Sequence, residues 1–176
     1  PQEWRSGTPA VKGNRAGAVK DLPPGPPRLI SWNITLKCPL KCTHCYVRAG
    51  EHEAAGVLST DEALGVIDQI RHVGTPVVVL SGGEPLMRTD LCTIARYGTD
   101  RGLRMVMGTS GYFLDRAMAA RLRDAGIRAV AVSIDSADPA VHDSFRGVSG
   151  AWEKAVQGIQ NCRDEGIGVQ INMTVM

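Results

Sequence analysis

The chain has 176 residues, the size of one domain with a substantial hydrophobic core. Its 20 Lys and Arg residues nearly balance its 18 Asp and Glu residues, which argues against a nucleic-acid partner. No apolar run is long enough to span a membrane and no signal peptide is visible, so we expect no membrane partner. Cysteines without evident partners favour a cytoplasmic location.

The two ends of the sequence differ from its middle. Residues 1–28 are rich in Pro and Gly and show little hydrophobic periodicity, which predicts a flexible lead-in; a proline-rich recognition segment is the alternative. We expect the core domain to occupy residues 29–176. The chain starts without Met and stops inside a strand-like run that reaches Met176, so we expect a fragment whose core domain is truncated at the C-terminus.

From Leu29 onward, short β-branched and apolar runs alternate with amphipathic segments. The expected strands are residues 29–35, 77–80, 104–108, 128–134 and 169–175. Four helices are expected. The first is capped by Ser59 or Thr60, the second by Asp90, and the other two cover residues 115–125 and 151–165. Apolar strands that alternate with helices predict an α/β fold with a parallel sheet covered by helices. The periodicity fits a barrel and a doubly wound sheet equally well.

Polar residues and glycines follow the ends of the expected strands. They form the segment 38–46 and the turns 82–85, 109–111 and 133–136. In parallel α/β folds, binding sites form at the edge where the strands end. We therefore expect these four segments to meet in one site.

The segment 38–46 carries Cys38, Cys42 and Cys45, three thiols on one short loop. A cubane iron–sulfur cluster has four irons, so three thiolates would leave one iron open to a ligand. Zinc would want a fourth ligand, and the only nearby candidate, His44, is adjacent in sequence to Cys45. A redox pair of Cys42 and Cys45 would leave Cys38 unexplained. Haem attachment needs His in place of Tyr46, and a disulfide framework is typical of small secreted chains.

The spacing C-x3-C-x2-C resembles the cluster loop of the radical S-adenosylmethionine (radical SAM) enzymes. The resemblance implies a partial (β/α)6 barrel with its last strand missing, and a [4Fe–4S] cluster on Cys38, Cys42 and Cys45. It also implies a reaction class. The reduced cluster cleaves S-adenosylmethionine to a 5′-deoxyadenosyl radical that abstracts hydrogen from a substrate. A reducing donor of the flavodoxin or ferredoxin type would supply the electron.

Further motifs match the same family in order along the chain. Gly82-Gly83-Glu84 resembles the GGE segment that meets the methionine amino group, and Gly residues let a backbone approach a ligand closely. Ser133 and Arg146 match the serine and arginine that hold the methionine carboxylate; a turn serine and a surface arginine are the alternative. Ser110 stands where relatives often carry Asn, which suggests a ribose contact.

The adenine contact departs from the family pattern. The residue before the last cysteine is commonly Tyr or Phe, and here it is His44, with Tyr46 just after the loop. The resemblance therefore leaves open which of the two rings meets the adenine. Cys92 and Cys162 have no nearby cysteine and are expected to be core thiols, with ligation of a second cluster as the alternative.

The stretches 145–155 and 166–172 resemble the branch that carries a C-terminal auxiliary-cluster (SPASM or twitch) domain. Within it, the chain is most similar to enzymes of alternative haem and d-type haem synthesis, such as didecarboxysiroheme deacetylase. Maturases of peptides in pyrroloquinoline quinone and mycofactocin synthesis are second. The resemblance implies a small-molecule or peptide substrate. A non-enzymatic iron–sulfur electron carrier is the alternative from another class, although a carrier needs no site for S-adenosylmethionine.

Overall fold

The computed structural model describes residues 25–53 and 55–175. The strands are β1 Leu29–Thr35, β2 Val77–Gly82, β3 Arg104–Thr109, β4 Ala129–Ser133 and β5 Gly168–Asn172. The helices are α1 Thr60–Val73, η1 Pro85–Met87, α2 Leu91–Asp100, α3 Arg116–Asp124, α4 Pro139–Arg146 and α5 Ala151–Asp164. Of the predicted flexible segment 1–28, residues 1–24 lie outside the described part of the chain.

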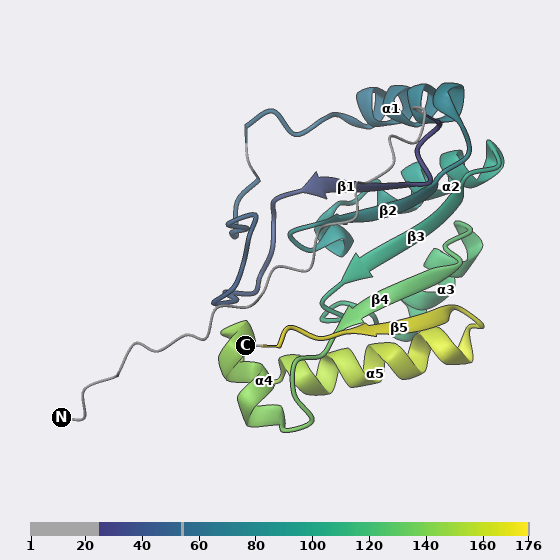
Figure 1. Cartoon of the computed structure of the whole chain (residues 1–176). Coiled ribbons are helices and arrows are strands. Elements are labelled where there is room, and N and C mark those ends of the chain that lie inside the picture. Colours follow the sequence, from purple (N-terminus) through teal and green to yellow (C-terminus); the bar gives the residue numbers. More distant parts are fainter. Residues whose placement is uncertain (1–24, 54, 176) are drawn as a thin grey trace, which may run out of the picture.

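The strands form one parallel sheet in the order β1-β2-β3-β4-β5, so each strand lies beside the next one in sequence. The sheet curls, and α1, α2, α3 and α5 cover its outer side (Figure 1). This is the arrangement of a (β/α) barrel rather than of a doubly wound sheet, in which the strand order reverses at a switch point. The predicted α/β partial barrel is confirmed.

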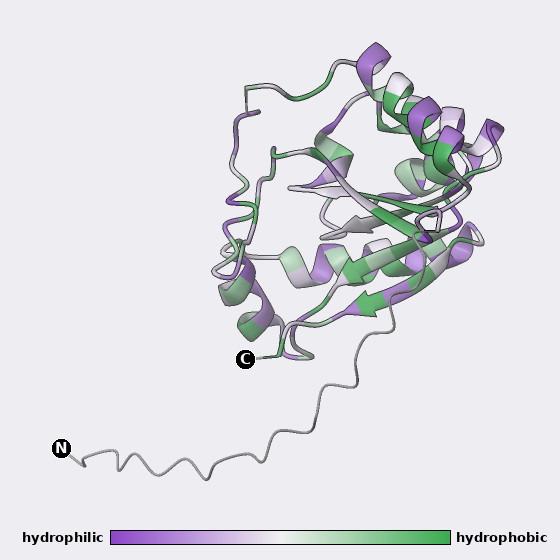
Figure 2. Cartoon of the chain, turned by 45° about the horizontal axis from the view of Figure 1, so that its top comes forward, coloured by the Kyte–Doolittle hydropathy of each residue, from purple (hydrophilic) through white to green (hydrophobic). Residues whose placement is uncertain are grey.

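The core lies between the outer face of the sheet and the helices. Val78, Leu80, Met105 and Met107 alternate along β2 and β3 and are fully buried, and they share a core cluster with Ile67 of α1 and other helix residues. Figure 2 shows hydrophobic residues along the strands and along the helix faces turned to them. The inner face carries smaller side chains toward the strand ends, which leaves room for a cavity there.

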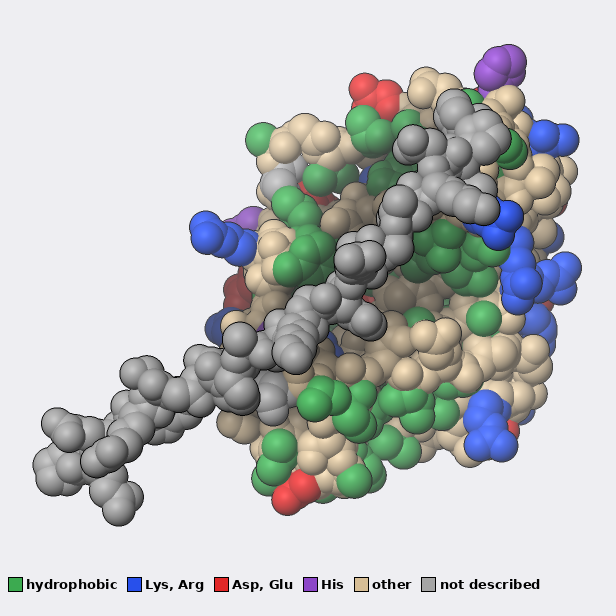
Figure 3. Space-filling view, in the orientation of Figure 1, with side chains coloured by type: hydrophobic (Ala, Val, Ile, Leu, Met, Phe, Trp, Pro, Cys, Tyr) green, Lys and Arg blue, Asp and Glu red, His purple; other side chains and the backbone are tan. Residues whose placement is uncertain are grey.

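Charge is unevenly distributed over the surface. Several Lys and Arg side chains gather at the side of the molecule where the strands begin, at the right of Figure 3. Arg28 precedes β1, Arg104 begins β3 and Arg128 precedes β4, and all three are exposed. The cysteine loop lies at the opposite edge. No helix within residues 25–53 and 55–175 is both long enough and apolar enough to cross a membrane.

Most boundaries agree with the expected ones to within two residues, and the larger differences concern α4, the last strand and one helix cap. Residues 139–146, for which no helix was predicted, form α4, which begins with Pro139 behind the capping Asp138. The last strand ends at Asn172 instead of continuing to Val175. Asp90 precedes α2 but makes no side-chain cap, because its carboxylate accepts hydrogen bonds from Arg88 and Thr60 instead. Ser59 caps α1 in a reciprocal capping box with Glu62.

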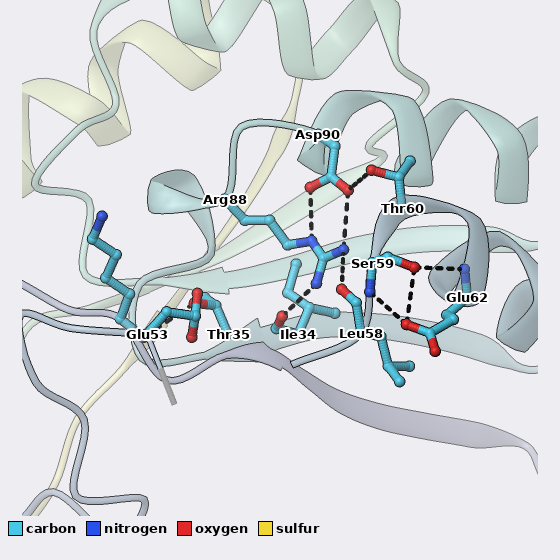
Figure 4. Close-up of polar contacts among 10 residues, drawn as sticks. Ile34, Thr35, Glu53, Leu58, Ser59, Thr60, Glu62, Arg88 and Asp90 are labelled. Atoms are coloured by element: carbon cyan, nitrogen blue, oxygen red, sulfur yellow. Dashed lines mark hydrogen bonds and ion pairs between the residues drawn. The ribbon is translucent and has the colours of Figure 1, made fainter. Parts of the chain in front are cut away.

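A buried arginine ties the start of the cysteine loop to the end of the segment that follows it (Figure 4). Arg88 donates to the carbonyl oxygens of Ile34 and Leu58, both at 2.9 Å, and to both carboxylate oxygens of Asp90 at 2.7 and 3.0 Å. Nearby, the carboxylate of Glu53 accepts hydrogen bonds from Thr35, through its hydroxyl, and from the backbone N–H of Leu36. These contacts fix where the loop leaves β1 and where the chain enters α1.

Candidate functional site

A cavity of about 250 Å³ lies at the edge of the sheet where the strands end. Nine of the ten predicted site residues line it: Cys38, Cys42, Cys45, Tyr46, Gly82, Gly83, Ser110, Ser133 and Arg146. The lining comes from the cysteine loop, from the ends of β2, β3 and β4, and from α4. The expectation that the four strand-end segments meet is therefore confirmed for this cavity.

The cysteine loop is closed on itself and fastened to α4. The backbone N–H of Cys38 donates to the carbonyl of Gly50 at 2.7 Å, and Gly50 donates back to Leu36 at 3.1 Å. The last carbonyls of α4, which have no partner within the helix, accept hydrogen bonds from the loop. Lys41 donates to Arg146 at 2.9 Å, and Thr43 donates to Phe145 at 3.2 Å.

The surroundings of the three thiols fit cluster ligands. Two sulfurs accept hydrogen bonds: Cys45 Sγ from the backbone N–H of Ala49 at 3.3 Å, and Cys42 Sγ from Arg146 Nη1 at 3.7 Å. Hydrogen bonds to ligand sulfurs are a usual part of the surroundings of iron–sulfur clusters. Burial raises the pKa of Cys38 to about 11, so this thiol needs a nearby cation to ionise near neutral pH.

Among the described residues, no three Cys, His, Asp or Glu side chains form a group that could hold a single metal ion. In a cubane cluster each thiolate ligates a different iron, so the three sulfurs need not converge on a point. Cys38, Cys42 and Cys45 line one cavity, and three thiolates are the ligands of a [4Fe–4S] cluster whose fourth iron is open.

The two glycines after β2 are required by backbone packing. A Cβ on Gly82, which has φ 136°, would lie 2.2 Å from the carbonyl oxygen of Thr35. A Cβ on Gly83 would lie 2.5 Å from the carbonyl oxygen of Lys37. Gly83 and Glu84 donate their backbone N–H groups to these same two carbonyls, each at 2.8 Å. The backbone of this turn thus supports the start of the cysteine loop. The same two glycines, Gly82 and Gly83, also line the cavity.

Glu84 is the one predicted site residue that does not line the cavity. It is fully buried, and its carboxylate accepts hydrogen bonds from the Thr109 hydroxyl at 2.8 Å and from the Ser110 N–H at 2.9 Å. The Ser110 hydroxyl and the N–H of Leu86 donate to it as well. Burial raises the pKa of this carboxyl, against the effect of these hydrogen bonds. Glu84 therefore holds Ser110 at the cavity wall from behind.

Arg146 faces the cavity with only part of its guanidinium. Its Nε and Nη2 each lie 2.7 Å from Asp135 Oδ2, and the Arg146 residue is only 8% exposed. Asp135 follows β4 directly, and its other oxygen accepts a hydrogen bond from the N–H of Thr174. The alternative that Arg146 is a surface charge is wrong.

Two aromatic side chains from the cysteine loop line the cavity. The His44 ring stacks on Phe145 of α4, with centroids 4.4 Å apart and planes 12° apart. Its buried Nδ1 has no hydrogen-bond partner among the described residues. Tyr46 is 78% exposed, and its hydroxyl donates to Asn33 Oδ1 at 3.3 Å. Both rings remain candidates for an adenine contact.

Sequence reasoning missed three residues of this region. Ser81 and Asn172 line the cavity, and Phe145 holds His44 from behind. Ser81 and Asn172 could have been found as polar residues at strand ends. Cys162 is fully buried in the core cluster, so the prediction of a core thiol is confirmed for it. Cys92 is only partly buried and packs against the same cluster from outside.

The family model that matches this chain is the Radical SAM superfamily, over residues 32–176. The chain therefore belongs to the radical SAM family of enzymes, whose cofactors are a [4Fe–4S] cluster and S-adenosylmethionine.

Two curated relatives place the chain within this family. The AdoMet-dependent heme synthase of Methanosarcina barkeri is 47% identical over 149 residues, which cover 85% of this chain and 43% of the relative. The mycofactocin maturase MftC of Mycobacterium tuberculosis is 31% identical over 150 residues, which cover 85% of this chain and 38% of that protein. The predicted order of similarity, haem synthesis first and peptide maturation second, is confirmed. The chain spans less than half the length of these relatives.

Among solved structures, SuiB of Streptococcus suis bound to S-adenosylmethionine matches with a TM-score of 0.72. The match covers 84% of this chain and 34% of SuiB, at 16% sequence identity. At this identity the likeness shows the shared fold alone.

Proposed function

We propose that this chain is the core domain of a radical SAM enzyme of haem synthesis, with a sirohaem-derived tetrapyrrole as substrate. The observation that carries the proposal is one cavity that joins the three thiols to Gly82, Gly83, Ser110, Ser133 and Arg146. When bound and reduced, the cluster supplies the electron that cleaves S-adenosylmethionine into methionine and a 5′-deoxyadenosyl radical.

Each part of the cavity has one task in this proposal. Cys38, Cys42 and Cys45 ligate three irons and leave the fourth for the amino and carboxylate groups of S-adenosylmethionine. Gly82 and Gly83, which line the cavity, accept hydrogen bonds from the amino group through their backbone carbonyls.

The remaining polar groups orient the rest of the cofactor. Ser133 and the free part of the Arg146 guanidinium donate to the carboxylate, a charge-assisted contact on the arginine side. Ser110 meets the ribose, and His44 or Tyr46 meets the adenine. The closed loop and α4 limit the access of water to the radical.

The remaining parts of the proposal concern the whole protein. Residues 29–176 form the core domain of this protein. A flavodoxin- or ferredoxin-type donor in the cytoplasm supplies the electron, and neither nucleic acid nor membrane takes part. We further propose an auxiliary-cluster domain of the SPASM or twitch type in the same protein.

A tetrapyrrole is favoured as substrate because the heme synthase relative is far more similar than the maturase, at 47% against 31% identity. A ribosomal peptide is the second candidate, supported by the similarity to the mycofactocin maturase. An electron carrier without catalysis would have no use for a polar wall of Ser110, Ser133 and Arg146 beside its cluster.

The test is reductive cleavage of S-adenosylmethionine by the full protein after anaerobic reconstitution with iron and sulfide. We expect methionine and 5′-deoxyadenosine in equal amounts with dithionite present. We also expect faster formation with iron tetrapyrroles that carry acetate and propionate side chains than with peptides. Cluster assembly without any cleavage would favour the electron carrier, and stimulation by a peptide alone would favour the maturase.

Ser133→Ala tests the carboxylate contact separately. Loss of one hydroxyl hydrogen bond costs about 1 kcal/mol, so the affinity for S-adenosylmethionine should fall about fivefold with the cluster intact. Ser136→Ala is a control, because Ser136 follows the same strand outside the cavity lining. Equal affinity in wild type and Ser133→Ala would place the carboxylate elsewhere.

A further inference from the structure

We propose that Arg146, oriented by Asp135, donates a hydrogen bond to the Cys42 thiolate and thereby raises the reduction potential of the cluster. This inference rests on the proposed function, since it requires the cluster on Cys42. It assigns to Arg146 a task that is separate from any contact with S-adenosylmethionine, and to Asp135 a positioning task.

The geometry divides the guanidinium into two parts. Nε and Nη2 both donate to Asp135 Oδ2 at 2.7 Å, which occupies one edge of the planar group. Nη1 is then directed toward Cys42 Sγ at 3.7 Å, a normal range for an N–H donor to sulfur. The Asp135 side chain is 5% exposed and that of Arg146 is 9% exposed, so water competes little for either contact.

Both ends of the Arg146 residue are fixed to the cysteine loop or to the sheet. Its carbonyl accepts a hydrogen bond from Lys41, one residue before Cys42. Its side chain is anchored through Asp135, which is itself fixed at the end of β4 and bonded to the N–H of Thr174 after β5. A lysine could not serve this arrangement, because it lacks a planar group that can meet two partners at fixed angles.

The effect on the potential follows from charge. Reduction adds one negative charge to the cluster, and hydrogen bonds to the ligand sulfurs are among the factors that set cluster potentials. The positive end of the Arg146–Asp135 pair faces the sulfur, while the negative end lies on the other side of the guanidinium. The pair therefore stabilises the reduced cluster more than the oxidised one, even though its net charge is zero.

The experiment compares two double variants of the full, reconstituted protein. Arg146→Gln with Asp135→Asn removes the pair beside Cys42 without leaving a lone buried charge. Arg88→Gln with Asp90→Asn is the matched control: this pair also has a 2.7 Å contact and an arginine side chain that is 8% exposed. Its hydrogen bonds go to Ile34, Leu58 and Thr60 instead of to one of the three loop cysteines. The potential is measured by redox titration monitored by electron paramagnetic resonance, without S-adenosylmethionine.

The signal of the cluster must first be separated from any other cluster in the protein. A Cys38→Ser, Cys42→Ser, Cys45→Ser triple variant lacks this cluster, and its spectrum is subtracted. If the triple variant binds as much iron as wild type, the proposed function fails before the inference is tested.

At the potential where the wild-type cluster is half reduced, we expect the reduced-to-oxidised ratio to fall about tenfold in the Arg146/Asp135 variant. For one electron this corresponds to about 59 mV. The Arg88/Asp90 variant should change the ratio by less than about twofold, because its charges lie away from the thiols.

Arg146→Lys is the second variant, and it tests the effect of Arg146 on the potential if the double variant does not hold a cluster. It keeps the positive charge but cannot meet Asp135 and Cys42 together, so we expect a fall of about threefold in the same ratio. Two results would overturn the inference. One is a reduced-to-oxidised ratio within about twofold of wild type in whichever Arg146 variant holds the cluster. The other is a change of this ratio in the Arg88/Asp90 control that equals the change in the Arg146 variant.

Discussion

His142 shows how tightly a single residue is fitted behind the site. It is 1% exposed, and its Nδ1 accepts a hydrogen bond from the backbone N–H of Asp135 at 3.2 Å. Burial lowers the pKa of His142, and the Arg146 cation lowers it further, while Asp135 and Asp143 act in the opposite direction. The imidazole therefore stays neutral in the folded protein at neutral pH.

A pH dependence of stability follows. Because the folded pKa of His142 lies below the unfolded value of about 6.5, the unfolded chain binds the extra proton more readily. The contribution of neutral His142 to the free energy of unfolding is fully present above pH 6.5. It is lost as the pH falls through the pKa that His142 has in the folded protein. Urea unfolding should show that wild type loses up to about 1 kcal/mol more than His142→Gln between pH 7.5 and 5.5. Equal losses would show that His142 does not titrate in this range.

At the scale of elements, α4 contributes most to the shape of the site. Its end supplies two carbonyls for the loop, the Phe145 ring for His44, and the Arg146 side chain for Cys42. Gly147, which ends this helix with φ 70°, has no room for a side chain, because a Cβ there would lie 2.7 Å from the carbonyl oxygen of Lys41. The loop can approach α4 only because residue 147 is glycine.

Gly147→Ala and Gly150→Ala separate this close approach from backbone strain. Both glycines have positive φ, 70° and 77°, but a Cβ on Gly150 would meet nothing within 4 Å. Each variant should lose about 1–2 kcal/mol of folding free energy from the left-handed backbone. Only Gly147→Ala should also displace the loop and lose iron faster to a chelator. Matching rates of iron loss in the two variants would argue against the close contact between α4 and the loop.

At the scale of the whole molecule, the sequence was enough to predict the sheet, because five apolar runs and their polar ends follow from local pattern. It did not predict α4, whose eight residues are too few for a clear period, although Asp138 and Pro139 carry a helix-start signal. The inward position of Glu84 depends on Thr109 and Ser110, 25 and 26 residues away, and the Arg146–Asp135 pair depends on how α4 folds back on β4. Such contacts between distant segments leave no local pattern.

The central claim is that Cys38, Cys42 and Cys45 together hold one [4Fe–4S] cluster, and iron analysis of cysteine variants tests it most directly. After anaerobic reconstitution, Cys38→Ser, Cys42→Ser and Cys45→Ser should each lose about four irons per chain relative to wild type. Cys92→Ser and Cys162→Ser should bind as much iron as wild type, because these two thiols lie in the core and outside the cavity. Full iron content in any of the first three variants, or its loss in Cys92→Ser or Cys162→Ser, would contradict the account.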